Sequence, residues 1–100
     1  MSIPRITPLF ADNAPEAIGH YSHAMHAGDF LFISGQLPVE KGSTMITKKT
    51  IEEQTHTVID NIEHILQAKD LKLFHVVRSE IFLSDINNFN KMNAIYAQRF

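Results

Sequence analysis

The chain has 100 residues, of which 44% are hydrophobic and 20% are charged, and its formal net charge is −2 at pH 7. This length suits one domain, and the composition is typical of a globular chain rather than a disordered one. A slightly negative chain offers nucleic acid no general attraction, because nucleic-acid-binding domains usually carry a basic stripe. The sequence contains no cysteine, which excludes disulfides, thiolate metal ligands and a cysteine nucleophile. The first ten residues do not read as a secretory signal and no apolar run reaches about 20 residues, so we expect a cytoplasmic protein.

The first third of the chain predicts short strands. Three prolines within residues 1–16 favour extended chain or an edge strand over helix. Residues 21–27 and the apolar run 29–34 have the composition of two strands, and the Ala-Gly-Asp sequence where they meet predicts a hairpin turn. Gly35 follows the second strand directly, where a glycine usually marks a bulge or a close approach by backbone or ligand. A second turn is expected at residues 41–43.

The clearest helical pattern begins at Thr50. Thr50 and Glu53 have the spacing of a capping box, and the helix is expected to end near Lys69. Five apolar residues share one stripe of this helix: Ile51, Val58, Ile62, Ile65 and Leu66.

The last third predicts a strand and a second helix. Residues 75–83 alternate between apolar and polar side chains, which is typical of a strand, and Asp85 can cap the helix that follows. Four apolar residues share one face of this second helix: Phe89, Met92, Tyr96 and Phe100. The order β-β-α-β-α, with room for one more strand before the first helix, predicts an α/β (α+β) domain with both helices on one face of a sheet.

Histidines and acidic residues do not form a convincing metal centre. Three histidines recur at every third position: His20, His23 and His26. On a strand the first and third of these share a face while the second points away, so we favour structural or surface roles over a metal site. On the first helix His56, Asp60 and His64 lie opposite the apolar stripe, which predicts a solvated charged face.

Three residues are candidates for a small pocket. Asn93 falls within the apolar stripe of the second helix, so its amide either bonds to neighbouring backbone or presents itself to a ligand. Tyr21 offers an apolar ring and one hydroxyl, which suits either a core or the orientation of a small polar substrate. Together with Gly35, these residues make a pocket plausible but leave its chemistry open.

Several short motifs follow one another in a specific order along the chain. They are Asn13-Ala14-Pro15, Ala17-Ile18-Gly19-His20-Tyr21-Ser22, Ser34-Gly35-Gln36-Leu37-Pro38, Gln54, Asn61, Phe82, Asp85, Phe89 and Asn93-Ala94-Ile95-Tyr96. In this order they resemble the reactive intermediate deaminase (Rid, or YjgF) family, also labelled endoribonuclease L-PSP. The resemblance runs from about Asn13 to Phe100.

This resemblance implies a fold, an activity and an assembly. The fold is a chorismate-mutase-like mixed sheet with two helices packed on one face, assembled as a homotrimer with clefts between subunits. The activity is hydrolysis of 2-imino and 2-enamino acids, such as 2-aminoacrylate and 2-iminobutanoate, to 2-keto acids and ammonia, without metal or organic cofactor. The positions that match the family's substrate cleft are Tyr21, Gly35 and Asn93, and Phe89 is expected to add apolar wall.

The chain also departs from the family pattern. The family's carboxylate-binding arginine and a late acidic residue belong to segments beyond Phe100, so we expect a single domain, residues 1–100, that lacks the family's C-terminal strands. Arg99 does not replace that arginine, because it lies in the helix ahead of the missing segment. His20 replaces a common proline, and Lys69 replaces the glycine that usually ends the first helix.

Three functions remain open. The first is imine deamination by the complete protein, with doubtful activity for these 100 residues alone. The second is a non-catalytic trimer that binds small carboxylates or regulates a partner. Ribonuclease action ranks last, because the chain lacks a basic and aromatic surface and a convincing acid–base histidine pair.

Overall fold

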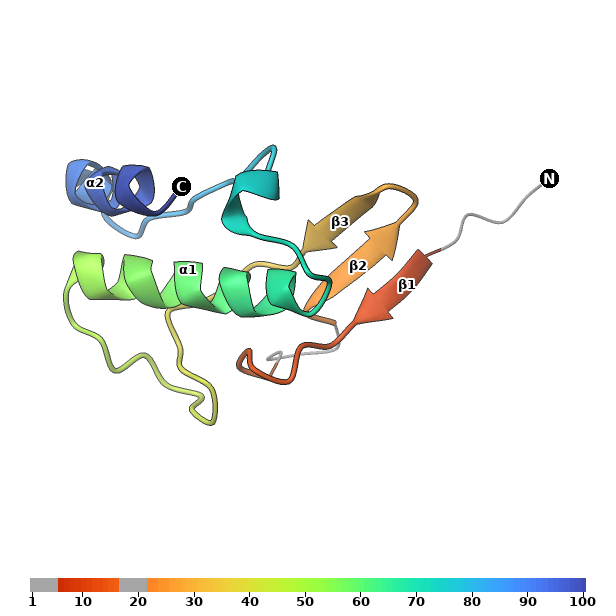
Figure 1. Cartoon of the computed structure of the whole chain (residues 1–100). Coiled ribbons are helices and arrows are strands. Elements are labelled where there is room, and N and C mark those ends of the chain that lie inside the picture. The colour runs from red at the N-terminus through yellow and green to blue at the C-terminus, as the bar shows by residue number, and fades with distance from the viewer. Residues whose placement is uncertain (1–5, 17–21) are drawn as a thin grey trace.

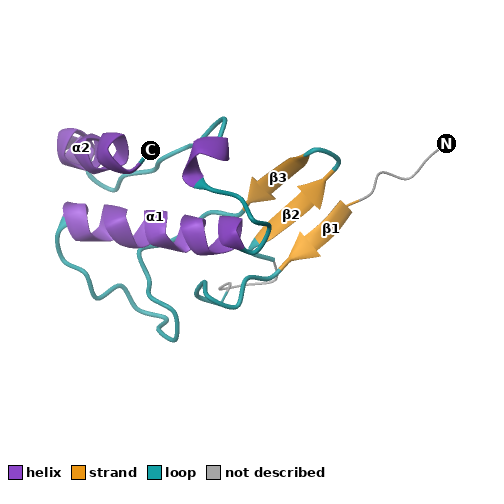
Figure 2. Ribbon diagram, viewed as in Figure 1, coloured by secondary structure: helices purple, strands orange, loops and turns teal. Residues whose placement is uncertain are grey.

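The computed structural model describes residues 6–16 and 22–100 of the chain, and Figures 1 and 2 show how its elements are arranged. A three-stranded sheet lies beside one end of a long helix, and a second helix lies over the other end. The α/β class predicted from the sequence is therefore confirmed. In chain order the elements are β1 (Ile6–Leu9), β2 (Ala24–Ala27), β3 (Phe30–Ile33), α1 (Ile51–Gln67), the 3-10 turns η1 (Leu73–His75) and η2 (Ile86–Asn88), and α2 (Phe89–Arg99).

The sheet is antiparallel, with the strand order β1-β2-β3. β2 and β3 form the predicted hairpin, in which Ala27 pairs with Phe30 across a two-residue turn. Gly28 holds a φ of 59° at the first position of this turn, the arrangement of a type II′ turn that matches the twist of the strands. β1 is an edge strand, as the prolines predicted, and Pro8 pairs with Met25.

The two faces of the sheet differ in what covers them. Ala24 of β2 is fully buried and packs with Ile65 of α1 in the core, and the cross-strand neighbours of Ala24 complete this inner face. Residues on the opposite side of the pleat are apolar but largely exposed, with Phe30 and Phe32 each 61% exposed. We call this set the outer face: Ile6, Pro8, Met25, Ala27, Phe30 and Phe32.

Helix α1 begins and ends with local hydrogen bonds. The Thr50 hydroxyl accepts a bond from the Glu53 amide at 3.1 Å and donates to the Glu53 carboxylate at 2.9 Å, so the predicted capping pair is present. The helix ends in a Schellman motif, in which the Leu71 amide donates to the Leu66 carbonyl and the Asp70 amide donates to the Gln67 carbonyl. The left-handed residue of this motif is Asp70, with a φ of 57°. The predicted glycine position at Lys69 is therefore one residue too early.

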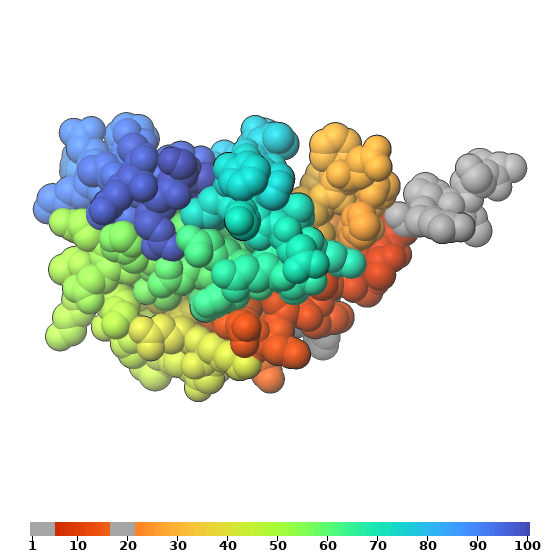
Figure 3. Space-filling model, viewed as in Figure 1, coloured from red at the N-terminus to blue at the C-terminus, as the bar shows by residue number. Residues whose placement is uncertain are grey.

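Helix α2 lies over the N-terminal half of α1, and the space-filling view shows the two helices in contact (Figures 1 and 3). The Asp85 carboxylate accepts from the Asn87 amide at 2.9 Å, so Asp85 starts the helical run that η2 opens. Met92 is the buried residue of α2, with 4% of its surface exposed. None of the helices in the described part of the chain is long and apolar enough to cross a membrane.

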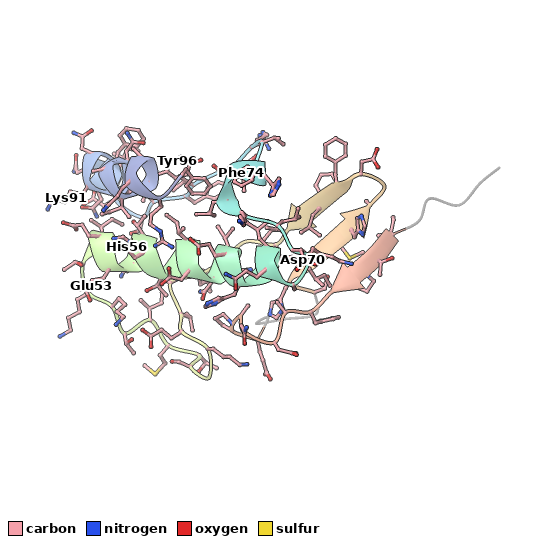
Figure 4. The ribbon with its side chains drawn as sticks, in the orientation of Figure 1. Glu53, His56, Asp70, Phe74, Lys91 and Tyr96 are labelled. Carbon is pink, nitrogen blue, oxygen red and sulfur yellow. The ribbon has the colours of Figure 1, made fainter. Side chains whose placement is uncertain are left out.

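A cluster around Arg99 joins the two helices. The guanidinium donates to His56 Nδ1 at 2.9 Å, to Asp60 Oδ1 at 2.7 Å and to Glu63 Oε1 at 2.8 Å. The prediction that His56 and Asp60 belong to a purely solvated face is therefore wrong. Helix α2 covers this side of α1, and Figure 4 shows His56 on the side of α1 that faces α2.

The strand predicted at residues 75–83 is absent from the structure. Residues 73–75 form the turn η1, and residues 76–83 belong to no strand or helix. Val77 is 88% exposed and Phe82 is 89% exposed. A strand needs a hydrogen-bonded neighbour, and no described residue pairs with this segment as a sheet ladder.

Candidate functional site

The predicted site residues lie on two separate parts of the described chain. Gly35 follows β3 and is exposed, whereas Phe89 and Asn93 lie on α2. Tyr21 lies outside the described residues. No hydrogen bond among the described residues joins Gly35 to Phe89 or Asn93, and α2 lies at the end of α1 away from the sheet (Figure 1). One copy of the chain therefore places Gly35 apart from the two candidates on α2.

Neither the backbone conformation nor any neighbouring atom among the described residues requires a glycine at position 35. A Cβ added at this position would meet no atom within 4 Å, and its φ is not in the left-handed region. In contrast, Gly28 and Gly42 hold φ values of 59° and 84°, which side chains other than glycine rarely adopt. The open space beside Gly35 is thus available to something that approaches its backbone from outside the described fold.

The segment around Gly35 is held at both ends; we call residues 34–39 the site segment. At its start, the Ser34 amide donates to the His23 carbonyl at 3.0 Å, and the Ser34 hydroxyl donates to the Ser22 carbonyl at 2.7 Å. At its end, the buried Asn61 amide of α1 donates to the carbonyls of Leu37 and Val39 at 3.1 and 2.8 Å. One anchor lies where β3 ends, on the loop that leads into β2, and the other lies on α1, so the segment between them is held at both ends.

The backbone between these anchors is left unpaired by the described residues. No described residue forms a hydrogen bond with the amide or the carbonyl of Gly35 or Gln36. The Gln36 side chain instead donates to the Ser34 carbonyl at 3.1 Å. An exposed stretch with available donors and acceptors can bind a small polar ligand through its backbone.

His23 is a structural residue of this region. It is 5% exposed, its Nδ1 accepts from the Ala11 amide at 2.7 Å, and its Nε2 donates to the Pro15 carbonyl at 2.6 Å. These two bonds require the neutral Nε2–H tautomer and occupy both ring nitrogens. Among residues 6–16 and 22–100, no group of three histidines or acidic residues could hold a metal ion.

Helix α2 presents its site candidates differently from the prediction. Asn93 is exposed, so its predicted place on a buried stripe is wrong, because α2 buries only Met92 fully. Phe89 is 48% exposed. Tyr96 donates to or accepts from Ser79 at 2.6 Å, which ties α2 to the 76–83 segment, and Figure 4 shows Tyr96 on the side of α1 where Phe74 also lies. Exposed residues of this kind can face a partner or a ligand.

Arg99 is committed to the helix pair. Burial opposes its charged form, yet hydrogen bonds to Glu63 and Asp60 and the negative charges of these carboxylates together raise the pKa of Arg99 above its ordinary value. With three acceptors already on its guanidinium, Arg99 is not available to anchor a substrate carboxylate. This agrees with the expectation that it does not replace the family's arginine.

Sequence reasoning missed the residues that support the site segment. Asn61 and Ser34 both belong to the motifs quoted above, but the sequence indicates no role for Asn61 and places Ser34 only at the end of the predicted strand 29–34. Their partners lie 24 and 12 residues away for Asn61–Leu37 and Ser34–Ser22, so no local pattern reveals them. The available signal was an asparagine in the middle of an amphipathic helix, which must find partners if it is buried.

The structure is that of a small α/β protein whose site segment follows a β-hairpin and exposes unpaired backbone groups. The chain matches the model of the endoribonuclease L-PSP family over residues 11–100, and it belongs to that family, which includes the RutC and Rid proteins.

Individual relatives support this assignment. A RutC family protein of Pyrococcus horikoshii is 45% identical over 92 residues, which are 92% of this chain and 73% of the relative. Protein HMF1 of Saccharomyces cerevisiae is 38% identical over 98 residues, which are 98% of this chain and 75% of the relative. The Rid protein YyfA from Yersinia pestis superimposes with a TM-score of 0.90 at 34% identity, covering 96% of this chain and 76% of that one. The YjgF gene product of Escherichia coli does so with a TM-score of 0.85 at 30% identity, covering 92% and 72%.

Proposed function

We propose that this protein hydrolyses reactive 2-imino and 2-enamino acids to 2-keto acids and ammonia, as 2-iminobutanoate/2-iminopropanoate deaminases do. The observation that carries the proposal is the family match over residues 11–100, which includes the site segment with its unpaired backbone at Gly35. An imine carbon is already electrophilic, so a catalyst need only hold the substrate, place a water molecule and move protons. A rigid strip of backbone donors and acceptors suits that task.

In this proposal four residues bind substrate. The backbone at Gly35 orients the imine nitrogen and the attacking water, and the absence of a Cβ lets the substrate approach. Tyr21 supplies a hydroxyl, Asn93 an amide and Phe89 an apolar wall. Because Gly35 and α2 lie apart within one chain, the proposal requires that Asn93 and Phe89 come from a neighbouring copy, or that they contact substrate across a larger cleft.

We propose that the protein assembles as a homotrimer and acts in the cytoplasm. The outer face supports the assembly, since a sheet face made entirely of apolar residues is typically covered by a partner. The exposed site candidates on α2 are consistent with a cleft that a second copy completes.

The activity is tested by stopped-flow loss of 2-aminoacrylate and 2-iminobutanoate. These substrates are generated in the instrument by a pyridoxal-phosphate enzyme acting on serine or threonine. Acceleration above the rate in buffer, proportional to the concentration of the protein, is the expected result. Decay at the buffer rate over a tenfold range of protein concentration would refute the proposal.

A non-catalytic binding or regulatory trimer is the alternative, and one observation favours it. The two arginines of the described chain each have a carboxylate partner already, Arg99 on α1 and Arg78 at Glu80, 2.6 Å away, although the Arg78 side chain is 77% exposed. Thermal shifts with 2-ketobutyrate in the absence of turnover would support this alternative. Ribonuclease action is less favoured, because the net charge is −2 and both nitrogens of His23 are occupied by backbone.

A further inference from the structure

We infer that Asn61 is a positioning residue that fixes the backbone of the site segment in its ligand-binding course. Asn61 lies in the middle of α1 and is 4% exposed, far too buried to meet a ligand itself. Its side-chain nitrogen donates to two carbonyls of the site segment, at Leu37 and Val39. The consequence for turnover rests on the proposed function, whereas the structural consequence does not.

The geometry makes this amide hard to replace. The two carbonyls that it binds lie on either side of Pro38, and the Val39 amide donates back to the Leu37 carbonyl at 2.8 Å, so the chain reverses tightly there. Two acceptors on either side of one tight turn need one group with two donor hydrogens, which an asparagine amide provides and a hydroxyl or a carboxylate does not. The Asn61 amide therefore fixes both the distance between the site segment and α1 and the orientation of the turn at residues 37–39.

The opposite anchor makes the effect specific to Gly35 and Gln36. Ser34 is fixed to the Ser22 and His23 carbonyls at the end of the sheet. With one end fixed on the sheet and the other on α1, the two residues between them have no freedom to shift. If Asn61 is lost, the end of the segment nearer α1 is released while the Ser34 end stays in place, and the unpaired groups of Gly35 and Gln36 no longer point in a defined direction.

Helix α1 supplies a matched control. Gln54 also carries a side-chain amide that donates to a loop carbonyl, that of Lys48 at 2.9 Å, but Lys48 lies outside the site segment. Asn61→Asp and Gln54→Glu make the same chemical change, from a donating amide to an accepting carboxylate. Because Asn61 is buried and Gln54 is half-buried, the pair Asn61→Ala and Gln54→Ala, which adds no charge, is measured as well. A general weakening of helix–loop contacts would affect both members of each pair, whereas positioning of the site would affect only the Asn61 variants.

The experiment combines amide hydrogen exchange with binding of 2-ketobutyrate and with turnover of 2-iminobutanoate. For Asn61→Asp we expect faster exchange at the Val39 amide, unchanged exchange at the Ser34 amide, and about 10- to 100-fold weaker 2-ketobutyrate binding. In turnover the loss should appear as a raised KM as well as a lowered kcat. Gln54→Glu should match the wild-type protein in all these measurements. If Asn61→Asp does not fold, Asn61→Ala, which removes the donors without adding charge, takes its place.

The outcomes separate this inference from the proposed function. Wild-type binding of 2-ketobutyrate without turnover would end the deaminase proposal, and weaker binding by the Asn61 variant would still support the positioning role. Equal binding by the Asn61 variant and the wild-type protein would overturn the inference, as would equal losses in both variants. A wild-type chain that neither binds nor turns over these compounds would overturn the proposed function, and unchanged exchange at the Val39 amide in the Asn61 variant would then overturn the positioning role as well.

Discussion

Gly28 and Gly35 both lie in the hairpin region, but only Gly28 has a backbone conformation that requires glycine. Gly28 needs its positive φ to close the β2–β3 turn, whereas Gly35 has an ordinary φ and open space where a side chain would lie. Substitution of each glycine therefore separates a folding requirement from a binding requirement.

Gly35→Ala is expected to leave the free energy of unfolding within about 0.5 kcal/mol of the wild-type value, because the added methyl meets nothing. Binding of 2-ketobutyrate is expected to weaken at least about tenfold, since a methyl group now stands where the ligand approaches. Urea denaturation and calorimetric titration measure the two effects. Gly28→Ala is the control, with a loss of about 1 kcal/mol in stability. A Gly35→Ala protein that binds like the wild type would remove Gly35 from the site.

Asp70 stands in a conformation that favours glycine. Its φ of 57° closes the Schellman motif at the end of α1, at a cost that only glycine avoids. Asp70→Gly is therefore expected to stabilise the protein by about 0.5–1 kcal/mol, after allowance for the greater freedom of glycine in the unfolded chain. The midpoint of urea unfolding measures this gain. Lys69→Gly, one residue earlier, should destabilise instead, and the opposite order of the two variants would contradict the assignment.

At the scale of elements, the Arg99 cluster determines how α2 sits on α1. Four polar side chains from the two helices meet in one place, and the Arg99 side chain is only 19% exposed. Arg99→Met keeps the aliphatic stem but removes the donors, so we expect a loss of about 1–2 kcal/mol in stability. Asp60→Asn should cost less, because Asp60 is 54% exposed and is better solvated.

The dependence on solution conditions follows from charge. The effect of Arg99→Met should shrink in about 1 M salt, which screens the partly exposed carboxylates. Since folding raises the pKa of Arg99, its stabilisation is complete below the ordinary arginine value and is lost only as the pH rises above it. Denaturation at several pH values between about 8 and 9, above the ordinary range of histidine and below that of arginine, should therefore give a constant difference between variant and wild type. A difference insensitive to salt would show that packing, not charge, holds α2.

Elements whose signals are local could be predicted from the sequence. The hairpin depends on Gly28 and two apolar runs, α1 on its Thr50 cap, and the start of the second helical run on Asp85, and each of these is a short-range interaction. Gly35 is predictable as a candidate for the same reason, because a glycine directly after a strand is a local signal of a bulge or of a close approach by a ligand.

Features that depend on distant partners could not be predicted. The alternation in residues 75–83 describes a strand only where a neighbour pairs with it, and the sequence does not state that neighbour. The burial of a position on α2 depends on where α1 lies, so the apolar pattern alone puts Asn93 on the buried face although it is exposed. The role of His56 depends on Arg99, which follows it by 43 residues.

At the scale of the whole molecule, the outer face is an apolar sheet surface that no other described element covers. If it is the interface of the proposed trimer, Phe32→Lys should raise the dissociation constant of the assembly by about 100-fold or more, because a buried unpaired charge costs several kcal/mol. Sedimentation velocity over a range of concentrations measures the mass. Met45→Lys is the matched control, since Met45 is 72% exposed on a loop away from the sheet. An unchanged assembly in Phe32→Lys would place the interface elsewhere.

The proline in β1 has a consequence for how the sheet can grow. Pro8 has no amide hydrogen, so the free border of β1 cannot offer a full row of donors to another strand. β3 has no proline, and its free border is intact over Phe30–Ile33. Main-chain pairing with any additional polypeptide, native or misassociated, is therefore directed to one side of this sheet.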